Sequence, residues 1–130
     1  MKRVWTNGCF DILHRGHAEM LAYAKSLGDH LTVGIDTDSK VKRDKGPERP
    51  YNTQEDRIYM LESLKSVDAV VVFDSASELE EVIKEIGPDV MVIGGDWRKK
   101  TVIGAKHVKK LIFFDRIGEY STTKILEHGT

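Results

Sequence analysis

The sequence predicts an α/β fold in which a five-stranded, mainly parallel sheet is doubly wound, with helices on both of its faces. Two features of the chain predict it. Short apolar runs rich in β-branched residues recur along the sequence, and amphipathic helical patterns lie between them. Strands that are apolar throughout are typical of parallel sheets, because helices cover both faces of such sheets. Alternating strands and helices are joined by right-handed crossovers, so the expected sheet is Rossmann-like.

The predicted strands are spread over the whole chain. They comprise residues 4–7, 31–35, 69–73, 90–93 and 111–114. The apolar residues with helical spacing fall within residues 18–23, 58–65 and 79–86. Asn52 or Thr53 is the expected N-cap of the second helix. The pair Gly87-Pro88 marks the end of the third helix.

Residues 37–52 are expected to form one long irregular stretch. It is rich in basic residues and prolines, namely Lys40, Lys42, Arg43, Lys45, Pro47, Arg49 and Pro50. A solvated loop is the plain interpretation of such a charge cluster. Long loops in a compact domain are often functional, however, and a mobile lid over a triphosphate fits this one.

Length and composition indicate a single domain over residues 1–130. The chain is 40% hydrophobic and 32% charged, and it shows no repeat or linker. One cysteine allows no internal disulfide, the start lacks a signal-peptide apolar region, and the longest run without a polar residue is far too short to span a membrane. We therefore expect a cytoplasmic protein. A net charge of −1 does not favour binding to nucleic acid.

His14 and His17 follow the first predicted strand at a spacing that places both on one face of a helix's first turn. Backbone N–H groups and the positive end of the helix dipole also point there, so an anion such as phosphate is expected to bind. This turn lies at the carboxyl end of a strand, where open α/β sheets bind ligands. Gly8 and Gly16 allow close approach of a ligand.

Two alternatives stand beside this interpretation of the histidines. They could be solvated or cap backbone groups. They could also bind zinc, but a zinc site needs further ligands. Cys9 is the only cysteine, and His30, His107 and His128 lie in unrelated contexts.

Two later segments also suggest nucleotide chemistry. In Gly94-Gly95-Asp96-Trp97, the glycines allow close approach to a flat ligand, the carboxylate accepts hydrogen bonds, and the indole stacks. The alternative is a tight turn with the indole at the edge of the core. Residues 121–123 are Ser, Thr and Thr, which would open a last helix and offer hydroxyls to an anion, or simply cap that helix.

Residues 8–17, GCFDILHRGH, resemble the signature of the cytidylyltransferase-like nucleotidyltransferase superfamily. That signature is Gly, any residue, Phe or Tyr, Asp, two apolar or small residues, His, any residue, Gly and His. The chain matches every defined position. The resemblance implies an enzyme that joins a nucleoside triphosphate to a phosphorylated metabolite and releases pyrophosphate, with both histidines stabilising the α-phosphate. The related aminoacyl-tRNA synthetases are far longer, and no Gly-x-Gly-x-x-Gly motif supports a dehydrogenase.

The same resemblance implies roles for individual residues. The catalytic residues would be His14, His17, Lys45 and Arg57. The nucleotide would contact Asn7, Gly8, Cys9, Phe10, Asp11, Gly16, Gly94, Asp96, Trp97, Arg116, Tyr120, Ser121, Thr122 and Thr123. The phosphorylated substrate would contact Asp38, Lys42, Lys45 and Arg57, with Lys42 as the fallback for Lys45.

Cofactor and partners follow from the resemblance as well. Mg²⁺ would be bound mainly by the triphosphate, without a direct protein ligand, and Asp11 would order the motif. The partners would be ATP or CTP and a sugar or polyol phosphate, and the family suggests a homodimer.

Two subfamilies and one different class remain open, and the first of the subfamilies below is favoured because more positions agree with it. Gly94-Gly95-Asp96 with residues 102–104, and residues 37–38 with 45–50, resemble the adenylyltransferase domain of ADP-heptose synthase, which acts on heptose 1-phosphate. Trp97 and residues 121–125 resemble instead glycerol-3-phosphate cytidylyltransferase, which forms CDP-glycerol. A catalytically silent nucleotide-binding domain is the alternative of another class.

Overall fold

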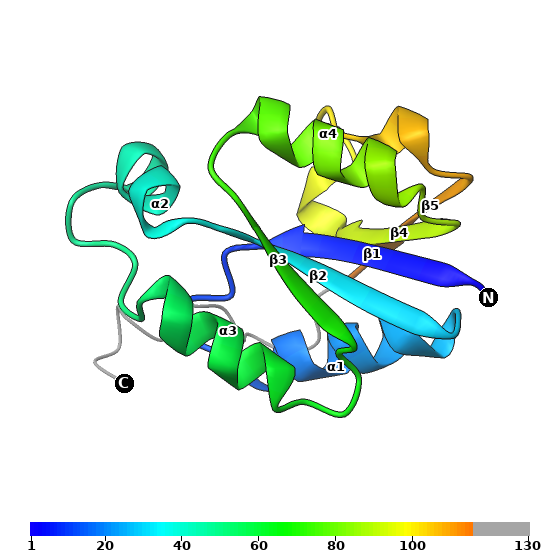
Figure 1. The fold of residues 1–130 in the computed structure, drawn as a ribbon, viewed down its shortest axis with the longest axis horizontal. Coiled ribbons are helices and arrows are strands. Elements are labelled where there is room, and N and C mark those ends of the chain that lie inside the picture. The colour runs from blue at the N-terminus through cyan, green and yellow to red at the C-terminus, as the bar shows by residue number, and fades with distance from the viewer. Residues whose placement is uncertain (116–130) are drawn as a thin grey trace.

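The computed structural model describes residues 1–115, which form one parallel sheet covered on both faces (Figure 1). The strands are β1 (Arg3–Gly8), β2 (His30–Asp36), β3 (Ala69–Phe73), β4 (Val90–Gly94) and β5 (Lys110–Phe114). They lie in the order β3-β2-β1-β4-β5, and every pairing is parallel. All five predicted strands are confirmed, with bounds that agree to within one residue.

The helices cover both faces, as the predicted doubly wound fold requires. Figure 1 shows α1 (Arg15–Ser26) and α3 (Gln54–Glu62) on one face and α4 (Ala76–Ile86) on the other. Short 3₁₀ turns, η1 (Gly95–Trp97) and η2 (Ala105–His107), lie in the connection from β4 to β5. Within residues 1–115, no helix is long and apolar enough to cross a bilayer.

Alternation along the strands produces two separate cores. Val4 packs with Leu21 of α1 and Leu61 of α3, whereas the next residue, Trp5, packs with Ile83 of α4 and Met91 of β4. The register places Val4 beside both Leu31 and Val90. Because successive side chains point to opposite faces, each strand contributes to both cores.

The predicted irregular stretch over residues 37–52 is wrong in its first half, where the chain forms α2 (Asp38–Lys45). Thr37 caps this helix by accepting a hydrogen bond from the Lys40 backbone N–H. Within the helix, the side chain of Val41 is buried. Gly46, with φ 110°, ends it. Within this helix, Lys40 and Asp44 are four residues apart and form an ion pair.

The second predicted helix begins at one of its two expected N-caps but ends at Glu62 rather than at residue 65. Thr53, one of the two expected N-caps, accepts a hydrogen bond from the Asp56 backbone N–H and opens α3. The helix ends at Glu62, and Ser63 is its C-cap. The last helix, predicted to begin at residues 121–123, lies outside the described residues.

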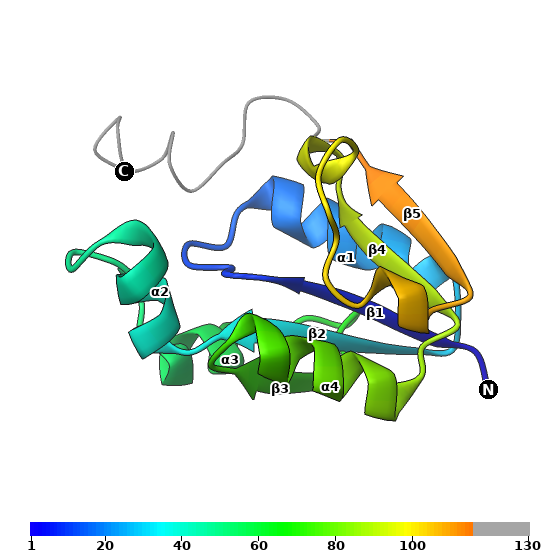
Figure 2. The same ribbon diagram turned by 90° about the horizontal axis from the view of Figure 1, so that it is seen from above.

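The strand order reverses between β1 and β4, whose carboxyl ends therefore form a topological switch point. Figure 2 shows α2 beyond the carboxyl ends of β1 and β2. The start of α1 lies at the same end of the sheet. The sequence motifs that follow strands thus gather where open α/β sheets bind ligands.

Candidate active site

The two motif histidines cap α1 together. The His17 backbone N–H donates to Nδ1 of His14 at 3.4 Å, and the His14 backbone N–H donates to Nδ1 of His17 at 3.3 Å. This reciprocal arrangement is a capping box in which both side chains are imidazoles. Each Nδ1 accepts a hydrogen, so the neutral rings carry their own hydrogen on Nε2. The capping alternative raised by the sequence is therefore confirmed, and it orients Nε2–H of each ring as a donor.

Packing holds the two rings in that orientation. The imidazoles stack with centroids 3.8 Å apart and an angle of 19° between their planes, and the Phe10 ring meets His17 edge-on at 5.1 Å. Phe10 has a φ of 50°, a strained conformation for a non-glycine residue. A Cβ on Gly8 would lie only 3.2 Å from the Phe10 ring, so glycine there gives the ring its space.

Asp11 ties this turn to the segment before α3. Its carboxylate is 2% exposed and accepts hydrogen bonds from the backbone N–H groups of Tyr51, at 2.8 Å, and Asn52, at 2.7 Å. Arg49 Nε also donates to it, at 3.2 Å. The carboxylate thus links the histidine turn to Arg49 and to the segment before α3 through hydrogen bonds within the protein.

Arg57 is buried below the same turn rather than lying in the cavity with Lys45. Its guanidinium donates to the Cys9 carbonyl at 3.0 Å, the Asn52 carbonyl at 3.2 Å and Asp38 Oδ1 at 2.8 Å. The side chain is fully enclosed. The structure therefore gives Arg57 and Asp38 internal partners: each supports the loop, and contact with a substrate would require these bonds to be exchanged.

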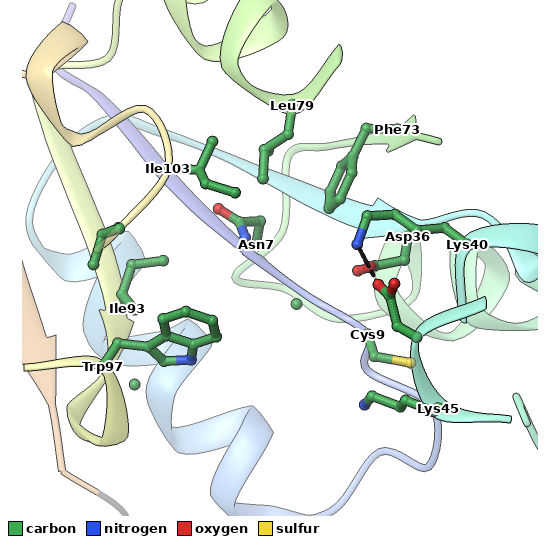
Figure 3. A pocket seen from close by; sticks show the side chains of 14 residues that line it. Asn7, Cys9, Asp36, Lys40, Lys45, Phe73, Leu79, Ile93, Trp97 and Ile103 are labelled. Atoms are coloured by element: carbon green, nitrogen blue, oxygen red, sulfur yellow. Dashed lines mark hydrogen bonds and ion pairs between the residues drawn. The ribbon is translucent and has the colours of Figure 1, made fainter. Parts of the chain in front are cut away.

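A cavity of about 360 Å³ lies at the carboxyl ends of β1, β2 and β4. Figure 3 shows Trp97 and Ile103 on one side and Lys40 and Lys45 of α2 on the other. Its lining residues are Asn7, Gly8, Cys9, Asp36, Lys40, Asp44, Lys45, Phe73, Leu79, Ile93, Gly94, Trp97, Val102 and Ile103. Predicted residues from three distant segments are thus brought together.

Other predicted residues, including the motif histidines His14 and His17, do not line this cavity. Phe10, Asp11 and Arg57 line a second hollow beside α3. Lys42, the fallback for Lys45, is exposed and does not line the cavity at the carboxyl ends of β1, β2 and β4. The predicted nucleotide ligands Arg116, Tyr120, Ser121, Thr122 and Thr123 lie outside the described residues.

Sequence reasoning missed a charge ladder on the α2 side of the cavity. Lys40 Nζ donates to Asp36 Oδ2 at 2.9 Å and to Asp44 Oδ2 at 2.6 Å. Burial alone would lower the pKa of Lys40, but the hydrogen bonds to Asp44 and Asp36 outweigh it and raise that pKa. The signal was the spacing of four residues between each carboxylate and the lysine, which the expectation of a loop concealed.

The thiol of Cys9 lies on the cavity wall. Burial raises its pKa, although the charges of Lys45 and Arg57 oppose that rise. The thiol therefore stays protonated at neutral pH, which makes it a poor nucleophile. A direct transfer between two bound ligands needs no such nucleophile.

The segment after β4 combines an open and a packed glycine. A Cβ on Gly94 would meet nothing within 4 Å, which leaves room for a ligand, whereas Gly95 packs against the ion pair of Arg98 and Asp115. The Trp97 ring is 46% exposed, and Lys100 Nζ lies 5.1 Å from its centre. Trp97 thus lies exposed at the edge of the cavity rather than in the core.

The parallel sheet, its switch point and a helix that begins just after the first strand are features typical of nucleotide-binding α/β domains. The chain belongs to the cytidylyltransferase-like family, whose model matches residues 5–127. The resemblance deduced from residues 8–17 is confirmed.

Curated relatives point to one group of proteins. The chain is 49% identical over 124 residues to the Bifunctional protein HldE of Nitratiruptor sp., covering 95% of this chain and 27% of that protein. It is 49% identical over 126 residues to the Bifunctional protein HldE of Sulfurimonas denitrificans, covering 97% of this chain and 26% of that protein. The chain thus spans about a quarter of the length of these relatives.

A solved structure shares most of the fold. It is the lipopolysaccharide core biosynthesis protein from Thermoplasma volcanium, with a TM-score of 0.69 and 27% identity. The match covers 93% of this chain and 99% of that one.

Proposed function

We propose that this domain is a nucleotidyltransferase that joins a nucleoside triphosphate to a sugar phosphate and releases pyrophosphate, with ATP and heptose 1-phosphate as substrates and ADP-heptose as product. The reciprocal cap of His14 and His17 carries the proposal, because it prepares two Nε2–H donors at the switch point. The names of the HldE relatives and of the lipopolysaccharide core biosynthesis protein support heptose 1-phosphate rather than glycerol 3-phosphate as the acceptor substrate.

The chemistry is an in-line displacement. An oxygen of the acceptor phosphate attacks the α-phosphorus of the triphosphate, a new P–O bond forms, and the bond to pyrophosphate breaks. The Nε2–H groups of His14 and His17 donate to α-phosphate oxygens, on which negative charge accumulates in the transition state. The protein positions the two substrates and neutralises charge, so no covalent enzyme intermediate is required.

The cavity supplies a place for the acceptor. Lys45, on the last turn of α2, would bind the acceptor phosphate, since it lines the cavity from the side nearer Cys9. Lys40 is held between two carboxylates and so contributes less net attraction for an anion. Leu79, Ile93 and Ile103 form an apolar wall that suits the carbon face of a sugar.

Mg²⁺ fits this site as an ion carried by the triphosphate. Within residues 1–115, no three or more His, Cys, Asp or Glu side chains cluster so as to hold a metal. Asp11 is engaged by backbone N–H groups and Arg49. In the proposed scheme, triphosphate oxygens provide most of the coordination, and the ion neutralises charge on the departing pyrophosphate.

The test is Mg²⁺-dependent pyrophosphate release in a grid of ATP and CTP against heptose 1-phosphate and glycerol 3-phosphate. The proposal expects release with ATP and heptose 1-phosphate and none in the matching reaction of the variant His17→Ala. Release only with CTP and glycerol 3-phosphate would assign the other subfamily. Nucleotide binding by calorimetry without release from any pair would instead indicate a binding domain. Sedimentation of the same preparation tests the homodimer that the family suggests.

A further inference from the structure

The floor of the cavity contains a buried hydrogen bond that the catalytic scheme does not use. Trp5 is fully buried in β1, and its indole Nε1–H donates to Asn7 Oδ1 at 2.8 Å. An indole nitrogen is only a donor, so the atom of the Asn7 amide that faces it must be the oxygen. The NH₂ group therefore occupies the other end of the amide.

The Asn7 side chain lines the cavity. Figure 3 shows it between Trp97 on one side and the Asp36 and Lys40 pair on the other. An amide held with its oxygen toward Trp5 presents two N–H donors to the cavity. A freely rotating amide would present its oxygen about as readily, and that oxygen would repel a phosphate.

Gly34 of β2 makes room for this arrangement. It is the register partner of Asn7, and a Cβ there would lie 2.5 Å from Cζ2 of Trp5 and 3.3 Å from Cβ of Asn7. Any larger residue would push the indole away from its place. The three residues thus form a unit in which Gly34 admits the indole and the indole orients the amide.

We propose that Trp5 is a positioning residue that fixes the Asn7 amide with its NH₂ toward the cavity, where it donates to a phosphate oxygen of the bound substrate. This rests on the proposed function, because it deepens the account of the same site. The contribution of one oriented hydrogen bond to an anionic oxygen corresponds to an affinity change of about tenfold.

The test is a double-mutant cycle with Trp5→Phe, Asn7→Ala and the double variant, measured as KM for each substrate in pyrophosphate release and as the Kd of ATP by calorimetry. Trp5→Phe keeps an aromatic side chain and removes the N–H donor. It is expected to raise KM or Kd about three- to tenfold in the wild-type background and to have almost no such effect once Asn7 is Ala. Equal effects of Trp5→Phe in both backgrounds would overturn the proposal, since they would reflect general loosening of the core.

Asn7→Asp is the second variant, and it leaves the core intact. Its carboxylate still accepts the bond from Trp5, so it replaces the NH₂ donors by an anionic oxygen at the same place. It should weaken binding more than Asn7→Ala does. The proposal fails if Asn7→Asp binds as well as the wild type does.

Two measurements distinguish a failure of this proposal from a failure of the proposed function. They are ligand binding and an NMR signal of the unliganded protein. If the wild type releases no pyrophosphate, the calorimetric Kd of ATP, or of inorganic phosphate where ATP does not bind, still reports the cycle. In addition, the Nε1–H resonance of Trp5 in the unliganded protein should shift and exchange faster with solvent in Asn7→Ala. An unchanged resonance would overturn the hydrogen bond itself, whatever reaction the domain performs.

Discussion

Two segments at the carboxyl end of the sheet, the histidine turn and α2, are held by different kinds of interaction. The histidine turn, residues 8–17, is fastened by backbone hydrogen bonds to Asp11 and by the mutual cap of its histidines. The α2 side is fastened by ion pairs between side chains, chiefly those of Lys40. Asp11 is almost fully buried, whereas the Asp44 side chain is 52% exposed.

This difference has a functional consequence. Buried hydrogen bonds hold a group in one geometry, as transition-state stabilisation requires, because water does not compete with them. The pair of Lys40 with Asp36 is largely enclosed, but its pair with Asp44 is open to solvent on the Asp44 side, and ion pairs of exposed groups are weak and screened by salt. We therefore expect the histidine turn to be rigid and to control turnover, and α2 to adapt to the acceptor and to control its affinity.

The largest expected effect is on the histidines. His14→Asn keeps an oxygen that can accept the capping bond but removes the Nε2–H donor, so turnover should fall by about 10²-fold or more. The free energy of unfolding should change by less than about 1 kcal/mol. Steady-state kinetics measures the turnover, and urea denaturation measures the free energy of unfolding. A near-normal turnover of both His14→Asn and His17→Ala would contradict the preorganised donors.

The second-largest expected effect is on the stability of the histidine turn. Asp11→Asn places an amide N–H group among three donors and should lower the free energy of unfolding by about 2 kcal/mol, with a loss of turnover. Glu55→Gln, an exposed change on the first turn of α3, is the matched control. If Asp11→Asn were as stable as that control, the histidine turn would not depend on buried hydrogen bonds.

A smaller effect is expected at Lys45. Lys45→Ala removes a charge that lines the cavity and should raise KM for the acceptor about tenfold with little change in kcat. Lys42→Ala changes the same charge on the exposed side of α2 and should leave KM unaltered. The opposite result for the two lysines would assign phosphate binding to Lys42.

The smallest effect concerns acid and salt. The hydrogen bond from Lys40 lowers the pKa of Asp44 below its ordinary value of 3.8. A carboxylate with a lowered folded-state pKa stabilises the fold above that ordinary value, and the contribution is lost as the pH falls through the lowered pKa. NMR shifts of α2 amides should therefore move toward coil values as the pH falls below the ordinary pKa of 3.8, and in high salt, before those of α1. Simultaneous changes in α1 and α2 would remove the distinction between the two segments.

Local sequence patterns were sufficient to predict much of the fold and the histidine motif. Each strand is a short run of β-branched residues whose apolar character is independent of its neighbours, so all five were predictable. The histidine motif was readable for the same reason, because its residues are contiguous. The helix α2 was missed because only one of its side chains, Val41, is buried, so it lacks the apolar periodicity on which helix prediction depends.

The partners of isolated polar residues could not be predicted in this way. Arg57 and Asp38 match family positions in the sequence, yet the structure pairs them with each other beneath the turn. A residue's partner depends on which segments the fold brings together, and these two lie 19 residues apart. Nothing in either local pattern distinguishes an internal partner from a ligand contact.

The sequence by itself determined the α/β class, the alternation of strands and helices, the family and the histidine pair, because each depends on residues that are neighbours along the chain. Only the tertiary structure decided that Lys45 rather than Lys42 lines the cavity, that Lys40 is held between carboxylates, and that Trp5 faces Asn7 beside Gly34. Those outcomes depend on the register of β1 against β2 and on where α2 meets the sheet. The physical reason is that long-range packing selects among contacts which the local pattern leaves equally possible.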